Sequence, residues 1–89
     1  MAWRIEYDEG AIADLKKLDR QAQREILDYM EKRVGRAVDP RTFGKPLRHS
    51  KFGLWRYRWR DFRIICQLQE QKLTVLVVSV GHRSKVYGQ

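Results

Sequence analysis

The sequence has little cysteine, little proline and no long apolar run. Its 89 residues include one cysteine, Cys66, and two prolines. A single thiol excludes an intrachain disulfide and a metal cluster built on several cysteines, which fits a reducing compartment. The longest apolar run, Leu73–Val80, is far too short to cross a bilayer, and the first residues lack the apolar stretch of a signal peptide. We therefore expect a cytoplasmic protein with no membrane partner.

Acidic residues are scarce in the second part of the chain. Residues 40–89 contain eleven Lys and Arg but only two acids, Asp61 and Glu70, and carry a net charge of +9, whereas residues 1–39 carry −1. This asymmetry indicates a polyanionic partner such as nucleic acid, an acidic protein, or both. Most metal-dependent nucleases gather carboxylates around Mg²⁺, so the scarcity of acids argues against a metal site, and we expect no cofactor.

The length and the apolar pattern predict one α+β domain over residues 1–89. It consists of a strand, a helical hairpin and a three-stranded antiparallel meander, with the two helices packed on one face of a small sheet. The expected strands cover residues 2–7, 54–59, 62–69 and 72–80. The last strand is apolar on both faces, so we expect it at the centre of the sheet with the first strand beside it. Cys66 is expected to be a small buried hydrophobe.

Two aspartates mark the starts of the expected helices. Asp8 can cap a short helix, and Asp19 can cap a longer one that ends near Gly35. The two helices follow each other almost without a loop, which predicts a tight hairpin. Residues 39–53 are expected to form a basic loop.

Aromatic and arginine residues alternate in the strand expected over 54–59. One face would carry Trp55, Tyr57 and Trp59, and the other Arg56, Arg58 and Arg60. If Arg60 and Asp61 form a two-residue turn, Arg58 lies directly opposite Arg63, and like charges in that position destabilise a sheet. An anionic ligand would neutralise the pair. Alternatively, the long side chains splay into water or stack on aromatic rings.

A second group of polar residues follows the last expected strand. Gly81 is expected to end this strand. After it come a proton-transfer group, two cations and a phenol: His82, Arg83, Lys85 and Tyr87. Without a metal ion to activate water, such a site suits RNA, whose 2′-hydroxyl can attack the adjacent phosphate. The products would be a 2′,3′-cyclic phosphate and a 5′-hydroxyl end, and DNA would be spared.

In their order and spacing, these motifs resemble the RelE/ParE toxin superfamily and, within it, the RelE-type mRNA interferases. The resemblance rests on Gly44-Lys45-Pro46-Leu47, Gly53-Leu54-Trp55-Arg56-Tyr57-Arg58, Asp61-Phe62-Arg63-Ile64-Ile65, Val80-Gly81-His82-Arg83 and Val86-Tyr87. It implies a toxin of a type II toxin–antitoxin system that cleaves mRNA on the ribosome, without a metal, and so inhibits translation. It also implies a cognate antitoxin as partner, with operator DNA contacted only through the antitoxin complex.

The resemblance further implies roles for single residues. Phosphate binding and stabilisation of transition-state charge would fall to Arg58, Arg63 and Arg83. His82 would transfer the proton, Tyr87 would orient the nucleotide, and Arg56 would hold the RNA backbone. Further RNA contacts are expected from Lys45, Arg48, Lys51, Arg60 and Lys85. Some relatives carry a lysine or glutamate as general base on the strand where this sequence has only arginines.

Two other functions remain open. A ParE-like inhibitor of DNA gyrase would share the fold and the basic character but not the arginine, histidine and tyrosine set. A non-catalytic module that binds RNA or the ribosome would use the same cations. In that module His82→Ala and Tyr87→Phe would leave activity intact, whereas a nuclease would lose most of its cleavage.

Overall fold

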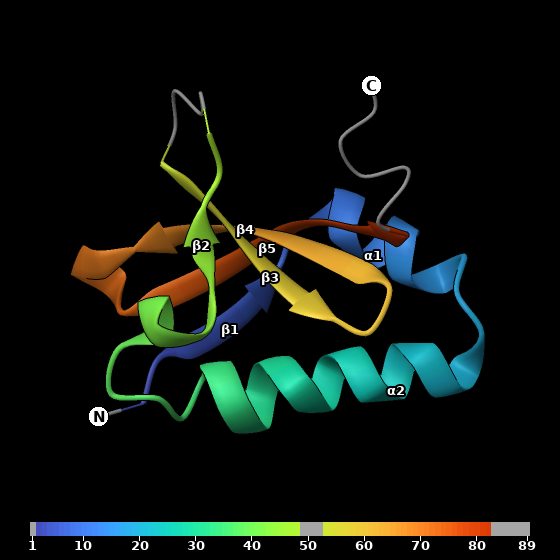
Figure 1. Ribbon diagram of the computed structural model, residues 1–89, viewed down its shortest axis with the longest axis horizontal. Helices are drawn as coiled ribbons and strands as arrows, with labels where there is room; N and C mark the ends of the chain where they lie inside the picture. Colours follow the sequence, from blue (N-terminus) through green and yellow to red (C-terminus); the bar gives the residue numbers. More distant parts are fainter. Residues whose placement is uncertain (1, 49–52, 83–89) are drawn as a thin grey trace.

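Two α-helices and a five-stranded sheet make up the fold (Figure 1). The computed structural model describes residues 2–48 and 53–82. In chain order the elements are β1 (Arg4–Tyr7), α1 (Glu9–Lys16), α2 (Arg20–Asp28), the π-helical segment η1 (Tyr29–Val34), the 3₁₀ turn η2 (Pro40–Phe43), β2 (Lys45–Pro46), β3 (Leu54–Trp59), β4 (Phe62–Gln69), the 3₁₀ turn η3 (Glu70–Lys72) and β5 (Thr74–His82). Segment η1 continues α2 directly. No helix among these residues is long and apolar enough to span a membrane.

The strands lie in the order β1-β5-β4-β3-β2. β1 runs parallel to β5, and the other neighbouring strands are antiparallel. The predicted α+β fold, the antiparallel meander and the first strand beside a central last strand are therefore confirmed. The register of β3 and β4 also follows the prediction, with Trp59 opposite Phe62 and Arg58 opposite Arg63.

Three details differ from the expectation. The region 39–53 is not only a loop, because it contains η2 and the short strand β2, which pairs with β3. Gly81 does not end β5, which continues to His82 because β4 offers pairing partners as far as Phe62. β5 also begins later than predicted, after η3 and Leu73, which closes that turn with a φ of 47°.

Both helices begin at the aspartates predicted from the sequence. The Asp8 carboxylate accepts a hydrogen bond from the Gly10 amide at 3.2 Å, and the Asp19 carboxylate accepts one from the Ala22 amide at 2.7 Å. These bonds satisfy amide groups that have no partner within the helix. The second helix, extended by η1, ends at Gly35 as expected.

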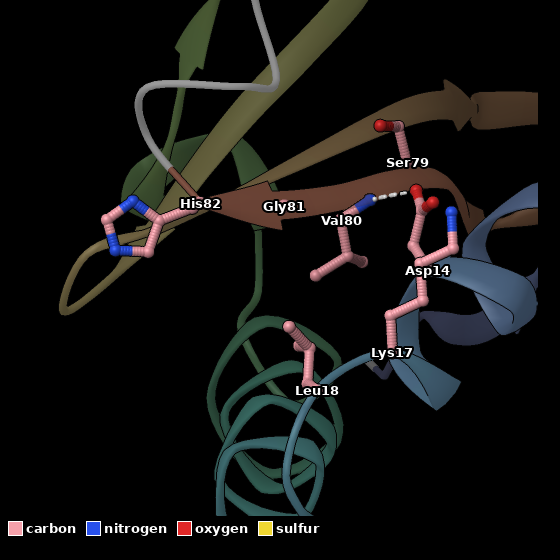
Figure 2. Close-up of a pocket in the computed structure, with 7 residues that line it drawn as sticks. All are labelled: Asp14, Lys17, Leu18, Ser79, Val80, Gly81 and His82. Atoms are coloured by element: carbon pink, nitrogen blue, oxygen red, sulfur yellow. Dashed lines mark hydrogen bonds between the residues drawn. The ribbon is translucent and has the colours of Figure 1, made fainter.

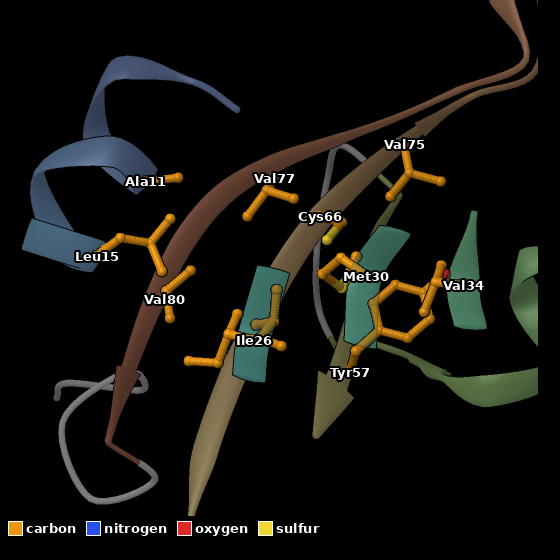
Figure 3. Packing of buried hydrophobic residues seen from close by; sticks show 11 residues of the cluster. Ala11, Leu15, Ile26, Met30, Val34, Tyr57, Cys66, Val75, Val77 and Val80 are labelled. Carbon is orange, nitrogen blue, oxygen red and sulfur yellow. The ribbon is translucent and has the colours of Figure 1, made fainter. Parts of the chain in front are cut away.

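The helices pack on one face of the sheet and close a core against it (Figure 3). Its buried members are Ala11, Leu15, Ile26, Met30, Val34, Tyr57, Ile64, Cys66, Val75, Val77 and Val80. Tyr57 is fully buried, and its hydroxyl donates a hydrogen bond to the Pro40 carbonyl oxygen at 2.9 Å. Cys66 is also fully buried, which confirms its expected place as a small core residue, and this burial raises the pKa of its thiol.

Gly44 allows a close approach between the chain leaving η2 and β3. A Cβ atom at this position would lie 2.8 Å from the Arg56 carbonyl oxygen and 2.8 Å from the Tyr57 ring. The strand holds the first neighbour and the core holds the second, so neither can move aside easily. Glycine therefore lets β2 lie against β3 and brings Lys45 next to Arg56.

We expect Gly44→Ala to lower the free energy of unfolding by about 1–3 kcal/mol, the usual effect of overpacking. Gly10→Ala is the matched control, because a Cβ there would meet the Val78 carbonyl oxygen at 3.4 Å, an ordinary contact. Alanine also favours the helix at that position. Urea denaturation followed by circular dichroism measures both variants, and equal stability of the two would contradict the close approach.

Candidate nucleic-acid interface

The face of the sheet opposite α1 and α2, here called the open face, carries four cations. The register and the alternation of side chains place Lys45, Arg56, Arg58 and Arg63 on it. Lys45 lies opposite Arg56, and Arg58 lies opposite Arg63. Two like-charged pairs therefore occupy neighbouring rows, an arrangement that lowers the stability of a sheet unless an anion neutralises it.

The Arg63 guanidinium has buried hydrogen-bond donors without an acceptor among the described residues. Its Nε and Nη1 atoms are buried and have no hydrogen-bond partner among the described residues. Ile65, two residues along β4 on the same face, is only 5 % exposed. A buried donor without a partner costs about 1–3 kcal/mol, and more when the group is charged. Phosphate oxygens beside Arg63 would satisfy these donors with charge-assisted hydrogen bonds.

The row that contains Arg58 and Arg63 continues at Gly81 of β5. Glycine places no side chain on the open face at that position. Arg58 is exposed, and within residues 2–48 and 53–82 neither Arg58 nor Arg63 forms an ion pair. Their positive charge is therefore available to a ligand.

Arg60 does not lie on the open face, contrary to the prediction from alternation. β3 ends at Trp59, and Arg60 adopts a φ of 54° in the turn to β4. Its Nε lies 2.9 Å from Glu25 Oε1 on α2, and its guanidinium lies over the Trp59 ring. The Trp59 indole N–H donates to the same carboxylate oxygen at 3.1 Å. Arg60 and Trp59 thus fasten the β3–β4 turn to the helix side of the sheet.

His82 is separated from the open-face arginines by the sheet. It is the register partner of Phe62, and the two rings meet edge to face with centroids 5.8 Å apart. Because side chains alternate along β4, Phe62 and Arg63 point to opposite faces, and His82 lies on the side of Phe62. The structure therefore does not bring His82 together with Arg58 and Arg63 on one face of the sheet, and its role in proton transfer stays a prediction.

His82 lines a pocket of about 360 Å³ between α1 and the end of β5 (Figure 2). Asp14, Lys17 and Leu18 form its helix side. Asp14 Oδ2 accepts a hydrogen bond from the Val80 amide at 3.0 Å, beyond the stretch of β5 that pairs with β1. The carboxylate takes the place of a neighbouring strand and protects this edge. Sequence reasoning missed Asp14, because nothing in a helical aspartate indicates which strand it reaches.

The remaining predicted residues fall into two groups. Lys45 and Arg48 are exposed, and β2 brings Lys45 onto the open face. The others, Lys51, Arg83, Lys85 and Tyr87, lie outside the described residues, and their roles stay predictions. In the described part of the chain, no three His, Cys, Asp or Glu side chains are grouped so as to hold a metal ion.

Comparison with known proteins identifies the family. Residues 5–87 match the family described as the ParE toxin of type II toxin–antitoxin systems. The match spans nearly the whole chain, and the chain belongs to this family, within the RelE/ParE toxin superfamily that the sequence motifs resemble.

Relatives match almost the full length of the chain. Toxin RelG of Mycobacterium tuberculosis is 25 % identical over 87 residues, which are 98 % of either protein. A chain of the toxin–antitoxin complex RelBE2 from the same organism superposes with a TM-score of 0.85 at 24 % identity, covering 96 % of this chain and 95 % of that one. The isolated E. coli RelE toxin superposes with a TM-score of 0.70 at 23 % identity, covering 97 % and 92 %. These likenesses confirm the predicted fold class.

Removing one charge from the open face should stabilise the fold. We expect Arg58→Gln to raise the free energy of unfolding by about 0.2–1 kcal/mol in low salt, because it relieves the repulsion between Arg58 and Arg63. The gain should shrink in about 0.5 M NaCl, where charges are screened. Arg20→Gln, at the exposed start of α2, is the control and should change little. Urea denaturation at both salt concentrations tests this, and a loss of stability in Arg58→Gln would contradict it.

The contacts of Glu25 should make stability depend on acid pH. Hydrogen bonds from Trp59 and then Gln21, together with the charge of Arg60, lower the pKa of the Glu25 carboxyl. Because the folded-state pKa is the lower one, the stabilisation is present above the unfolded-state pKa and is lost as pH falls through the folded-state value.

Glu25→Gln should therefore be less stable than wild type at neutral pH, and the difference should shrink as the pH falls through the folded-state pKa, which lies below the ordinary glutamate value. Thermal unfolding across this pH range measures the effect. Asp28→Asn, which removes an exposed carboxylate one turn further along α2, is the control. A difference between Glu25→Gln and wild type that does not shrink anywhere on the acid side would argue against an ionised Glu25 holding the turn.

Proposed function

We propose that this chain is the toxin of a type II toxin–antitoxin system and that it inhibits translation by cleaving mRNA on the ribosome without a metal ion. The observation that carries the proposal is Arg63, a guanidinium on a rigid strand with buried, unpartnered donors and a second arginine directly opposite. A site that holds unneutralised positive charge before the ligand arrives suits a phosphate whose negative charge grows in the transition state.

The proposed reaction uses the nucleophile that RNA itself carries. The 2′-oxygen attacks the adjacent phosphorus, the bond from phosphorus to the 5′-oxygen of the next nucleotide breaks, and a 2′,3′-cyclic phosphate and a 5′-hydroxyl result. Arg58 and Arg63 would hold the non-bridging oxygens as charge builds on them, and Lys45 and Arg56 would hold the backbone alongside. The scissile phosphate would lie next to Arg63, whose register partner on β5 is Gly81.

Proton transfer needs a group other than arginine, which keeps its proton at any physiological pH. The 2′-hydroxyl must lose a proton and the leaving 5′-oxygen must gain one. His82, Arg83 and Tyr87 are the residues proposed to take part in these steps. His82 stands at the end of β5, one residue beyond Gly81, so RNA would meet it by passing over the end of the sheet.

A cognate antitoxin is the proposed protein partner. Several solved structures with this fold are toxin–antitoxin complexes, from M. tuberculosis, E. coli and Pyrococcus horikoshii. An acidic antitoxin would neutralise the net charge of +8 and compete with RNA for the open face. Contact with operator DNA would then be made through the antitoxin in the complex.

Inhibition of DNA gyrase is the second candidate, because the matched family is described by its ParE toxins. A gyrase inhibitor has no need of unsatisfied donors on Arg63, whereas a phosphate-cleaving site does. A supercoiling assay with purified gyrase, run beside an in vitro translation assay, separates the two functions.

Arg63→Ala should reduce cleavage of translated mRNA at least about 100-fold, the usual effect of removing one preorganised group that stabilises transition-state charge. Arg63→Lys should recover only part of the activity, because an ammonium keeps the charge but lacks the guanidinium fork. The 5′ ends of mRNA from a purified translation system, mapped by sequencing, measure both variants. Arg20→Ala, at the start of α2, is the control and should cleave mRNA as the wild type does.

The translation assay also has outcomes that would overturn the proposal. Cleavage on ribosomes should persist when the protein is stripped with EDTA and dialysed before it is added, and added Mn²⁺ or Zn²⁺ should not increase it, while the ribosomes keep their own Mg²⁺ throughout. Intact messages with wild-type protein, or supercoiling inhibition without any mRNA cuts, would refute the nuclease function.

A further inference from the structure

The pocket between α1 and the end of β5 lies directly beside the proposed phosphate site. It measures about 360 Å³, and sites for small organic groups span about 300–1,000 Å³. Gly81 lines this pocket and is also the register partner of Arg63. Neighbouring strands lie only about 4.8 Å apart. A nucleotide next to a phosphate bound at Arg63 can therefore reach the pocket by crossing the end of β5.

Asp14 has acceptor capacity that the fold does not use. Its Oδ2 atom accepts the hydrogen bond from the Val80 amide at 3.0 Å, and its Oδ1 atom has no partner among the described residues (Figure 2). A carboxylate has two oxygens and about four lone-pair sites, so one backbone amide leaves most of them open. The Val80 bond also holds the half-buried side chain in place. Asp14 therefore presents fixed acceptors to the pocket that it lines.

A free cation and two apolar side chains complete this part of the lining. Lys17 is exposed and forms no ion pair with any residue in 2–48 or 53–82. Leu18 and Val80 contribute apolar surface (Figure 2). The pocket thus combines acceptors, a charged donor and an apolar wall, and the proposed cleavage step uses none of these four side chains.

We propose that this pocket binds a guanine base of the RNA, in a nucleotide next to the phosphate that is cleaved. Guanine carries two donors, N1–H and the N2 amino group, beside one acceptor, O6. The Asp14 carboxylate would accept from both donors, and Lys17 would donate to O6. Leu18 and Val80 would contact the base. Unpaired RNA is read in this way, through the Watson–Crick edges of bases that are splayed out of a helix.

Other ligands match this set of groups less well. Adenine has a bare N1 where guanine has N1–H, so its lone pair would face the Asp14 carboxylate. Cytosine and uracil each offer that carboxylate one donor group instead of two. A phosphate would be repelled by Asp14. A metal ion would find too few ligands, since no three His, Cys, Asp or Glu side chains are grouped to hold one in the described part of the chain.

This inference rests on the proposed function for RNA as the ligand, and it adds Asp14 as a residue that determines base specificity. Asp14 also holds the edge of β5 through the Val80 amide, so the test variant must keep that bond. Asp14→Asn does so, because the carboxamide oxygen still accepts from the amide. Its NH₂ group places donors where the second carboxylate oxygen was, and it cannot accept from guanine.

The first measurement maps cleavage sites in a purified translation system, using messages that differ only in the base beside the cut. The wild type should cleave sites with guanine at least about tenfold faster than the same sites with adenine, and Asp14→Asn should reduce this ratio to about threefold or less. Glu9→Gln removes an exposed carboxylate from the same helix and should keep the wild-type ratio. A merely structural loss would slow cleavage at both kinds of site and leave the ratio unchanged.

The second measurement needs no cleavage. In nuclear magnetic resonance titrations of the full chain, GMP should shift the Val80 amide and Leu18 methyl signals at least about tenfold more tightly than AMP, which has the same ribose and phosphate. Lys17→Met should weaken GMP binding about threefold or more, because it removes the donor to O6. Lys16→Met, at the neighbouring exposed position outside the pocket, should bind GMP as the wild type does.

The outcomes separate this inference from the proposed function. Equal binding of GMP and AMP by the wild type overturns the guanine site. An undiminished guanine preference in Asp14→Asn, with thermal unfolding showing that the variant is folded, overturns it as well. If the wild type cuts no mRNA but GMP still binds selectively at Val80 and Leu18, and Lys17→Met weakens that binding, the proposed nuclease fails and the guanine site stands.

Discussion

Tyr57 is fully buried between the sheet and the helices, with its hydroxyl bonded to the Pro40 carbonyl oxygen. Because successive side chains of a strand alternate, this burial commits Arg56 and Arg58 to the open face. A slip of β3 by one residue would bury both arginines and expose the tyrosine, which would cost roughly several kcal/mol. The core therefore sets the register, and the repulsion between Arg58 and Arg63 is tolerated because the core outweighs it.

The acids of the first part of the chain are used mainly inside the fold. Asp8 and Asp19 cap helices, Asp14 protects the edge of β5, and Glu25 holds the β3–β4 turn. Each of these carboxylates accepts a hydrogen bond from a nearby backbone amide or pairs with a nearby cation. Among the described residues, Arg58 and Arg63 on the open face form no ion pair, so this surface is left with a preference for anions.

Local patterns were sufficient to predict much of this molecule. The alternation of aromatics and arginines, with a two-residue connection, defined β3, β4 and their pairing, because a period of two and a short turn leave one register. The caps at Asp8 and Asp19 were equally predictable, since a cap involves residues within one turn. The pair formed by Arg58 and Arg63, the centre of the candidate site, follows from these local rules alone.

Tertiary structure decided the contacts between distant residues and the residue at which each strand ends. Alternation ends with β3, so Arg60 turns to Glu25 on α2, a contact across 35 residues that no local pattern contains. β5 continues along β4 for two residues more than expected, which places His82 beside Phe62 and away from the arginines. The sequence alone thus determined which residues face each other across the meander. Packing of the helices against the sheet decided the long-range contacts of the acids, because it alone brings Asp14 to the Val80 amide and Glu25 to Arg60.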